Sequence, residues 1–168
     1  SFRHDAPLDM RMDLTQAETA ADLLQRLTEE EIADLLYHLG GERGSRRIAR
    51  RIVEARERRA AVATTGQLER LVRGALKVRG HKRIHPATRT FQALRMAVNR
   101  ELEALDAFLE AAPETLAPGG ALAVIAFHSG EDRRVKHGFK ALAQSGRFLL
   151  IRKAAVRPSR EECRANPR

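Results

Sequence analysis

An unbroken apolar run at residues 121–127 constrains the fold of this chain more than any other feature of its sequence. The run reads Ala-Leu-Ala-Val-Ile-Ala-Phe, and it lies between a Pro-Gly-Gly turn at 118–120 and His128. Such a run, with turn residues beside it, is typical of a strand that is buried on both faces. A helical segment at 131–144 and a second apolar, β-rich run at 147–156 follow it. This order predicts an α/β sheet.

The part of the chain before this run has the apolar spacing of helices instead. Apolar side chains recur there at steps of three and four residues. Helices are expected at residues 17–27, 28–39, 45–59, 64–76 and 86–112. Thr28 and Glu31 have the spacing of a capping box, and Gly40 and Gly41 offer a left-handed stop to the same helix. Pro86 fits the first turn of the last helix, where its missing N–H is not needed.

The formal net charge is +9, but the charge is not spread evenly. Residues 43–100 carry 17 basic and 3 acidic side chains, a net charge of +14, whereas residues 1–42 carry 3 basic and 10 acidic ones. A basic block of this density repels itself unless a polyanion neutralises it, so it favours a surface that faces nucleic acid. The alternative is a solvated, arginine-rich helical surface. The expected outer face of the 45–59 helix carries Arg46, Arg47, Arg50 and Arg51.

Composition argues against several kinds of site. Aromatic residues make up 4% of the chain, with one Tyr and no Trp, which argues against RNA binding that depends mainly on stacking platforms. The single cysteine, Cys163, excludes an internal disulfide and a zinc site built from cysteines. His81 and His85 lie in a basic loop, and we expect no metal there. The single cysteine fits a reduced, cytoplasmic setting. No apolar run reaches the roughly 18 residues of a membrane span, so we expect no membrane partner.

Three segments of the chain together resemble the RsmH/MraW family of methyltransferases. The first is Ser-Phe-Arg, followed by Pro-Leu-Asp-Met-Arg-Met-Asp, within residues 1–13. The second is His-Pro-Ala-Thr-Arg-Thr-Phe-Gln-Ala-Leu-Arg at 85–95, whose length and unusual composition make it the most specific. The third runs from the turn at 116–120 to Arg133, and the tail at 157–168 matches as well. The resemblance therefore covers almost the whole chain, in the order of the family.

The resemblance implies a Rossmann-like, class I methyltransferase core of α/β type with an all-helical domain inserted into it. Residues 14–86 are then the basic inserted domain that recognises RNA, residues 1–13 end the first part of the core, and residues 87–168 form its C-terminal part. The implied activity is S-adenosylmethionine-dependent methylation of cytosine N4 in 16S ribosomal RNA of the small ribosomal subunit. The exact nucleotide and the oligomeric state are left open.

The chain departs from the family pattern at two points. Gly130 stands where the family has a bulky aliphatic residue, which loosens the turn after His128. The family's N-terminal half, with the Gly-rich loop and the acidic residue that hold the cofactor, is absent, and no G-x-G-x-x-G occurs. We therefore expect no cofactor-binding residue in this chain, a missing half upstream of Ser1, and no methyl transfer by the chain alone.

Methyl transfer to an exocyclic amine is an in-line displacement, so most of the catalysis is positioning. Ligands of α/β sheets bind beyond the carboxyl ends of the strands, which makes His128 and Ser129 the catalytic candidates. The alternative for His128 is to close the strand end, and the alternative for Ser129 is to cap the next helix. We expect Arg133 to contact phosphate or to pair with Asp132.

The other expected RNA contacts lie on the long helix and in the basic loop before it. Arg89 and Asn99 share one helical face, with Arg95 somewhat off it. Arginine forks bind phosphates, and the alternative for these arginines is a pair with Asp9 or Asp13. The whole set of expected RNA contacts is Arg46, Arg47, Arg50, Arg51, Lys82, Arg83, Arg89, Arg95, Asn99 and Arg133.

Two other functions remain open on sequence alone. One is a helical RNA- or DNA-binding module without catalysis, which the expected buried strand disfavours. The other is a methyltransferase of the same fold with another substrate. The basic block argues against a small-molecule substrate but does not select one RNA target.

Overall fold

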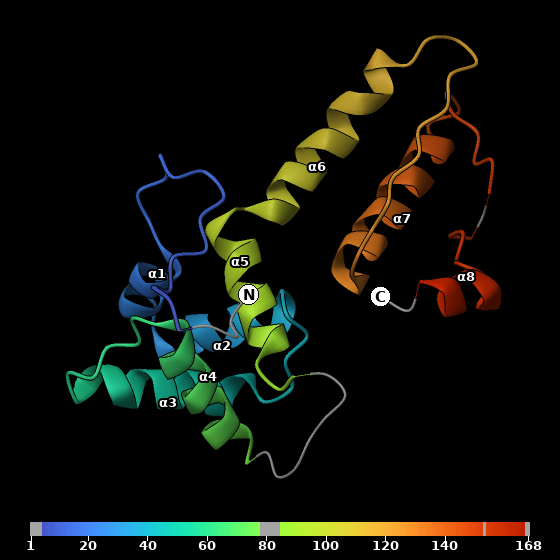
Figure 1. Ribbon diagram of the computed structural model, residues 1–168. Coiled ribbons are helices and arrows are strands. Elements are labelled where there is room, and N and C mark those ends of the chain that lie inside the picture. Colours follow the sequence, from blue (N-terminus) through green and yellow to red (C-terminus); the bar gives the residue numbers. More distant parts are fainter. Residues whose placement is uncertain (1–4, 78–84, 153, 167–168) are drawn as a thin grey trace. The chain divides into compact units, whose positions relative to one another are not determined.

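The regular structure of the chain is helical in a computed structural model that describes residues 5–77, 85–152 and 154–166 (Figure 1). Its internal contacts divide it into two compact units, Ser1–Leu105 and Asp106–Arg168. The inserted domain expected at 14–86 from the family pattern stays a prediction.

The first four helices follow the predicted segments, and threonine caps fix where three of them begin. The helices of the first unit include α1 (Ala20–Arg26), α2 (Glu29–His38), α3 (Ser45–Glu57), α4 (Thr65–Leu76) and α5 (Thr88–Val98). The capping box predicted at Thr28 is confirmed. Its hydroxyl accepts from the Glu31 amide at 3.3 Å, and the Glu31 carboxylate accepts from the Thr28 amide at 2.8 Å. Thr19 and Thr64 cap α1 and α4 in the same way.

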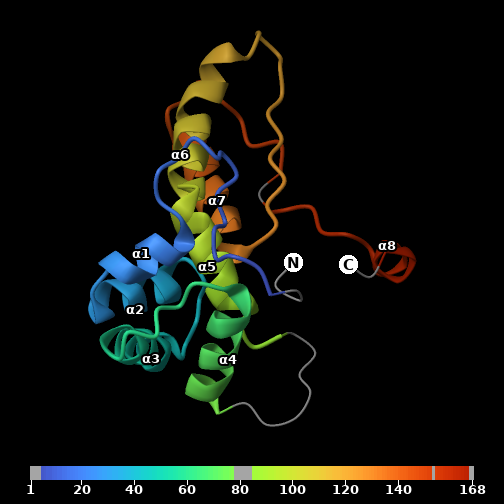
Figure 2. The ribbon, with the colours of Figure 1, turned by 60° about the vertical axis from the view of Figure 1, so that its left-hand side comes forward.

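Apolar side chains of these helices meet in one core. The largest fully buried ones include Leu8, Ile32, Leu36, Ile48, Ile52, Leu68, Val72 and Leu94. α2 packs against α3 and α5, and α3 packs against α4, as Figures 1 and 2 show from two directions. Complete burial of one such side chain contributes about 1.5–3 kcal/mol. The core therefore holds α3 with one face inward and the opposite face in solvent.

The segment before α1 is tied to this unit by backbone hydrogen bonds. The Leu8 amide donates to the Ala63 carbonyl at 2.9 Å, and the Ala21 amide donates to the Leu8 carbonyl at 2.9 Å. The segment thus runs past the start of α4 and the start of α1, and the Leu8 side chain belongs to the core.

The single long helix predicted at 86–112 is wrong, because two helices occupy that segment. α5 ends at Val98, and α6 (Glu101–Ala111) begins after a short break. Asn99 is the C-cap of α5, and Arg100 has a φ of 49°, a left-handed conformation that a right-handed helix does not contain. The apolar spacing continues across the break, which is why the spacing alone did not indicate it.

The predicted α/β sheet is also wrong. The described residues contain no strand, and their one β-type pairing is an isolated bridge between Pro7 and Thr64. Residues 121–127 are extended but unpaired (Figure 1), and Ile125 and Phe127 are 81% and 90% exposed. A strand is stable only where neighbours satisfy its amide and carbonyl groups, and no described segment does so here. The Rossmann-like core implied by the resemblance is therefore not seen among the described residues.

The second unit is built on the end of α6 and on α7 (Ser129–Gln144). A 3-10 turn (Ala112–Thr115) follows α6, and the short α8 (Arg160–Ala165), which was not predicted, lies near the end of the chain. α7 agrees with its prediction and stops before Gly146, whose φ of 76° is a left-handed conformation that glycine adopts without strain. Leu109 of α6 lies against α7 where Gly138 provides room, since a Cβ there would be 3.3 Å from Leu109 Cδ1.

Candidate nucleic-acid interface

The outer face of α3 gathers four of the predicted RNA contacts. Ile48, Ala49 and Ile52 are at most 1% exposed, and helical spacing turns the positions between them toward solvent. The exposed side chains are Arg46, Arg47, Arg50 and Arg51, called the α3 basic face below. Since the opposite side of the helix is locked in the core, this face is presented by a rigid element.

Two of these arginines have acidic neighbours on the surface. Nε of Arg50 lies 3.7 Å from a carboxylate oxygen of Glu29, and Nη1 of Arg51 lies 3.4 Å from one of Glu54. Both pairs are largely exposed, and exposed pairs contribute at most about 1 kcal/mol. An incoming phosphate can therefore replace either carboxylate at small cost. In the described part of the chain, the other two arginines form no ion pair.

The predicted contacts on α5 take part in interactions within the protein. Nη1 of Arg89 donates to the Gly41 carbonyl at 3.3 Å. Arg95 forms a two-pronged ion pair with Glu101, at 2.7 and 2.9 Å. Contact of either arginine with RNA stays a prediction, and it would require one of these interactions to be given up.

Asn99 fastens the segment before α1 to the end of α5. Its Nδ2 donates to the carbonyls of Met10 and Arg95, both at 2.8 Å, and its Oδ1 accepts from the Met12 amide at 2.7 Å. Both side-chain donors and one acceptor position are therefore in use. The expected contact with RNA stays a prediction, beside a structural role that the sequence did not indicate.

His128, and not Ser129, is the N-cap of α7. Its Nδ1 accepts from the amides of Gly130 and Glu131, at 3.1 and 3.3 Å. The Glu131 carboxylate accepts in turn from the amides of Phe127 and His128, at 2.8 and 3.3 Å. Because Nδ1 accepts, the proton of the neutral imidazole is on Nε2, 3.3 Å from Oε1 of Glu131. The capping role considered for Ser129 is wrong, since Ser129 is the first, exposed residue of the helix.

The catalytic candidates and the α3 basic face belong to different units. Arg133 is exposed on α7, and Asp132 pairs with Lys136 at 2.6 Å rather than with Arg133. The predicted contacts are therefore divided between the two units. Lys82 and Arg83 lie outside the described residues.

A recess at the corner between α2 and α3 was not predicted. It has a volume of about 400 Å³. Its lining residues are Ala33, Asp34, Tyr37, His38, Arg43, Gly44, Ser45, Arg46 and Arg47. The sequence held a signal for it, because Tyr37 lies off the apolar stripe of α2 that Ile32 and Leu36 form. An aromatic ring beside arginines is a usual feature of surfaces that bind single strands.

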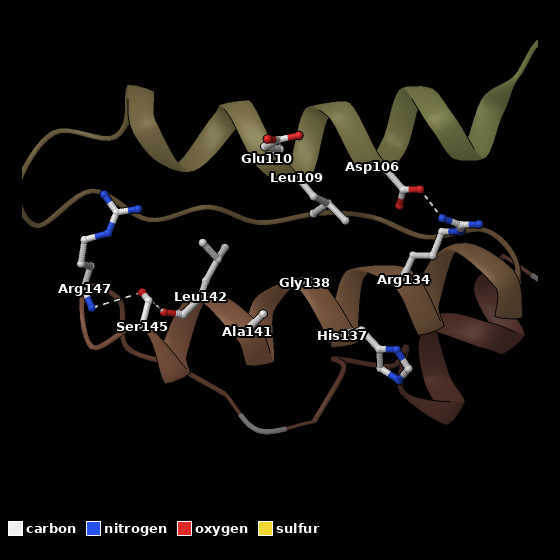
Figure 3. Close-up of a pocket in the computed structure, with 10 residues that line it drawn as sticks. All are labelled: Asp106, Leu109, Glu110, Arg134, His137, Gly138, Ala141, Leu142, Ser145 and Arg147. Atoms are coloured by element: carbon white, nitrogen blue, oxygen red, sulfur yellow. Dashed lines mark hydrogen bonds and ion pairs between the residues drawn. The ribbon is translucent and has the colours of Figure 1, made fainter.

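A second cavity, of about 540 Å³, lies between α6 and α7 in the other unit (Figure 3). Figure 3 shows Leu109 directed from α6 toward α7, and Arg134 reaching across to Asp106, with which it forms an ion pair. His137 points away from α6. This cavity is therefore the space left along the contact of two packed helices, and its polar groups do not converge on a site.

The described residues offer no other obvious centre. No three His, Cys, Asp or Glu side chains among them are placed to hold a metal ion. A membrane-spanning helix is likewise not found in this part of the chain.

Comparison with known proteins identifies close relatives along the entire chain. The model of the MraW methylase family matches residues 1–168. Ribosomal RNA small subunit methyltransferase H of a Cyanothece strain is 56% identical over 168 residues, which are 100% of this chain and 54% of the relative. Its namesakes from Synechococcus elongatus and a Methylobacterium strain are 52% and 50% identical, again over 100% of this chain and 55% and 54% of their own length. The chain thus spans about half the length of the curated relatives it matches.

Proposed function

Because this chain belongs to the MraW methylase family, we propose that it takes part in the methylation of small-subunit ribosomal RNA and supplies a surface that binds the RNA. The observation that carries the proposal is the α3 basic face, with four exposed arginines on one rigid helix. Arginine forks match phosphate oxygens, and phosphate contacts position an RNA without reading its sequence.

The arginines of the proposed surface differ in how readily they can contact RNA phosphates. The four of the α3 basic face come first, because they have either no ion-pair partner among the described residues or a weak surface partner. Arg133, exposed on α7, is a further candidate. Arg89 and Arg95 come last, because each must first leave an internal partner.

We further propose that the methyl donor is S-adenosylmethionine and that the acceptor is N4 of a cytosine in 16S ribosomal RNA. The cytosine amine is a weak nucleophile, since its lone pair is delocalised into the ring. A group that accepts its N–H would concentrate electron density on nitrogen, and positioning would supply most of the remaining catalysis. Ser129 is exposed and available for such a contact. His128 offers no free acceptor, because its Nδ1 caps the helix and its Nε2 carries the ring proton and is buried.

The described residues do not fit S-adenosylmethionine. Its carboxylate and ribose require close backbone amides of a Gly-rich turn between a strand and a helix, with an acidic side chain nearby. No such turn occurs among these residues. We therefore propose that the chain alone binds the cofactor weakly or not at all and transfers no methyl group. Calorimetry with the purified chain tests this: micromolar affinity for the cofactor, or methyl incorporation into small-subunit RNA, would refute it.

The proposed RNA surface is tested through the salt dependence of binding. Each phosphate contact with single-stranded RNA lowers log K by about 0.7 per unit of log salt concentration. If Arg46, Arg47, Arg50 and Arg51 all contact phosphates, replacing them together by Ala should flatten the slope by about 3. The measurement is the anisotropy of a labelled single-stranded RNA at several salt concentrations.

The control removes the same number of charges elsewhere. Arg152, Arg157, Arg160 and Arg164 are exposed in the second unit, and replacing these four by Ala lowers the net charge equally. If the α3 basic face is the interface, the control leaves most of the slope in place. Equal flattening in both variants would mean that only net charge matters, and it would refute the assignment to α3.

The alternative function, a helical module that binds RNA without catalysis, is favoured by the lack of strands among the described residues. For this chain alone, both functions predict RNA binding without methyl transfer. They separate in a longer protein that contains this sequence. Methylation of small-subunit RNA that weakens when the α3 arginines are replaced supports the methyltransferase, whereas RNA binding without any methylation supports the alternative.

A further inference from the structure

The recess between α2 and α3 has the size and composition of a site for one unpaired nucleotide. Its volume of about 400 Å³ lies in the range of small-ligand sites. Asp34 and Tyr37 line it from α2, and Arg46 and Arg47 line it from the first turn of α3. Because the two helices pack directly against each other, these side chains are held together at a fixed corner of one unit.

Tyr37 is the part of the recess that suits a base. It is 55% exposed, although Ile32 and Leu36 of the same helix are 0% exposed. Its ring lies almost perpendicular to the His38 ring, with centroids 5.2 Å apart and an interplanar angle of 84°, a contact that favours one orientation of the tyrosine. The exposed part of the ring offers a π-surface, on which any base can stack.

The charges of the recess separate a phosphate position from a base position. Arg46 and Arg47 stand in the first turn of α3, which has no acidic residue and no side-chain cap, so the positive end of the helix adds to their charge. Asp34 lies one turn before Tyr37 in α2, and its carboxylate repels phosphate from that side. Glu42, 6% exposed, accepts a hydrogen bond from the Gly44 amide at 2.8 Å, so its carboxylate offsets part of the positive helix end and leaves the phosphate contact to the two arginines. A string of phosphates is therefore disfavoured, whereas one phosphate beside one neutral base fits.

We infer that the recess binds one nucleotide of single-stranded RNA, with the base stacked on Tyr37 and the phosphate held by Arg46 and Arg47. The inference rests on the proposed function and makes it narrower, because it selects unpaired RNA over a duplex. In a duplex each base is covered by its stacked neighbours and is not free to stack on a side chain. The low aromatic content of the chain is no obstacle, since one ring serves one base.

Tyr37 carries its own signal for the test. The chain has one Tyr and no Trp, so its tyrosine emission comes from Tyr37 alone, and a base stacked on the ring quenches that emission. The whole 168-residue chain is titrated with oligouridylate, and inorganic polyphosphate serves as a polyanion without bases. Binding is measured independently by the anisotropy of labelled oligouridylate, with polyphosphate as competitor. Free N-acetyltyrosinamide in the same RNA solutions corrects for absorption by the RNA.

Substitutions separate stacking from folding. Loss of a stacking ring weakens binding by about five- to 150-fold, and this loss is expected for Tyr37→Ala but not for Tyr37→Phe, which keeps the ring. Phe108→Ala is the matched control, because Phe108 is also a surface ring, 45% exposed, and lies in the second unit. Circular dichroism checks that each variant keeps its helices.

The outcomes distinguish the inference from the proposed function. The nucleotide site is supported if oligouridylate quenches the tyrosine emission, if bound polyphosphate does not, and if only Tyr37→Ala loses affinity for oligouridylate. Binding of oligouridylate without quenching, equal quenching by polyphosphate, or an equal loss in Phe108→Ala overturns the nucleotide site and leaves the basic RNA surface intact. An absence of any RNA binding by anisotropy overturns the proposed RNA surface itself, and the nucleotide site with it.

Discussion

Replacing Asn99 by Ala should destabilise the first unit by about 1–3 kcal/mol, because two of the hydrogen bonds that are lost join distant parts of the chain. Asn99 donates to the Met10 carbonyl at 2.8 Å and accepts from the Met12 amide at 2.7 Å. Each such bond contributes about 0.5–1.5 kcal/mol net. The third bond, to the Arg95 carbonyl at 2.8 Å, is local and adds little. The segment that is released also carries Leu8, which is 1% exposed in the core.

Tyr37 again provides the assay, because it lies in the same unit as Asn99 and is the chain's one tyrosine. Urea unfolding followed by its emission reports on this unit alone. Gln92→Ala is the matched control, since Gln92 is a partly exposed amide on the same helix. An Asn99→Ala variant as stable as Gln92→Ala would refute the structural role. If the RNA affinity of that Asn99→Ala variant fell at the same time, the role of Asn99 would be the predicted RNA contact instead.

Two further perturbations test the helix termini. Nη1 of Arg56 donates to the carbonyls of Leu24, Gln25 and Leu27 at 3.2, 2.8 and 2.7 Å, which satisfies backbone carbonyls at the end of α1. Arg56→Ala should therefore lower the free energy of unfolding in urea by about 1.5–3 kcal/mol. A loss no larger than that of the exposed Arg58→Ala would contradict this. Hydrogen bonds from the Thr28 amide and hydroxyl lower the pKa of Glu31 in the folded chain. The carboxylate therefore stabilises the fold at pH values above the pKa of the unfolded carboxyl, about 4.3. This stabilisation is lost as the pH falls through the lower pKa of the folded state. Glu31→Gln keeps the capping geometry without a titrating group, so its stability should depend less on pH between about 5 and 3; an unchanged pH profile would refute the assignment.

Helix starts and the inward face of α3 were predictable, because local sequence decides both. A capping box is formed by residues three apart, as Thr28 and Glu31 show, so its signal is contained in four consecutive letters. The inward face of α3 follows from the spacing of Ile48, Ala49 and Ile52, and the arginines between them are exposed as expected.

The break between α5 and α6 depends on contacts that no local pattern contains. Asn99 bonds to Met10 and Met12, which precede it by 89 and 87 positions. Arg100, next to it, takes a left-handed conformation, to which its residue type gives no preference. The capping role of His128 escaped prediction for a related reason, because serine beside it is the commoner N-cap residue.

The apolar run at 121–127 shows why a strand cannot be predicted from its own residues. Burial of an apolar side chain contributes about 1.5–3 kcal/mol, but Ile125 and Phe127, at 81% and 90% exposed, gain almost none of it. Leu94, in a helix with apolar side chains spaced for one face, is 0% exposed, because α5 satisfies its own backbone and needs only one neighbouring surface. An extended segment needs a second chain segment for its hydrogen bonds and two covering layers for its side chains. The run therefore has the composition of a strand, but residues outside it decide whether it pairs with a neighbouring segment.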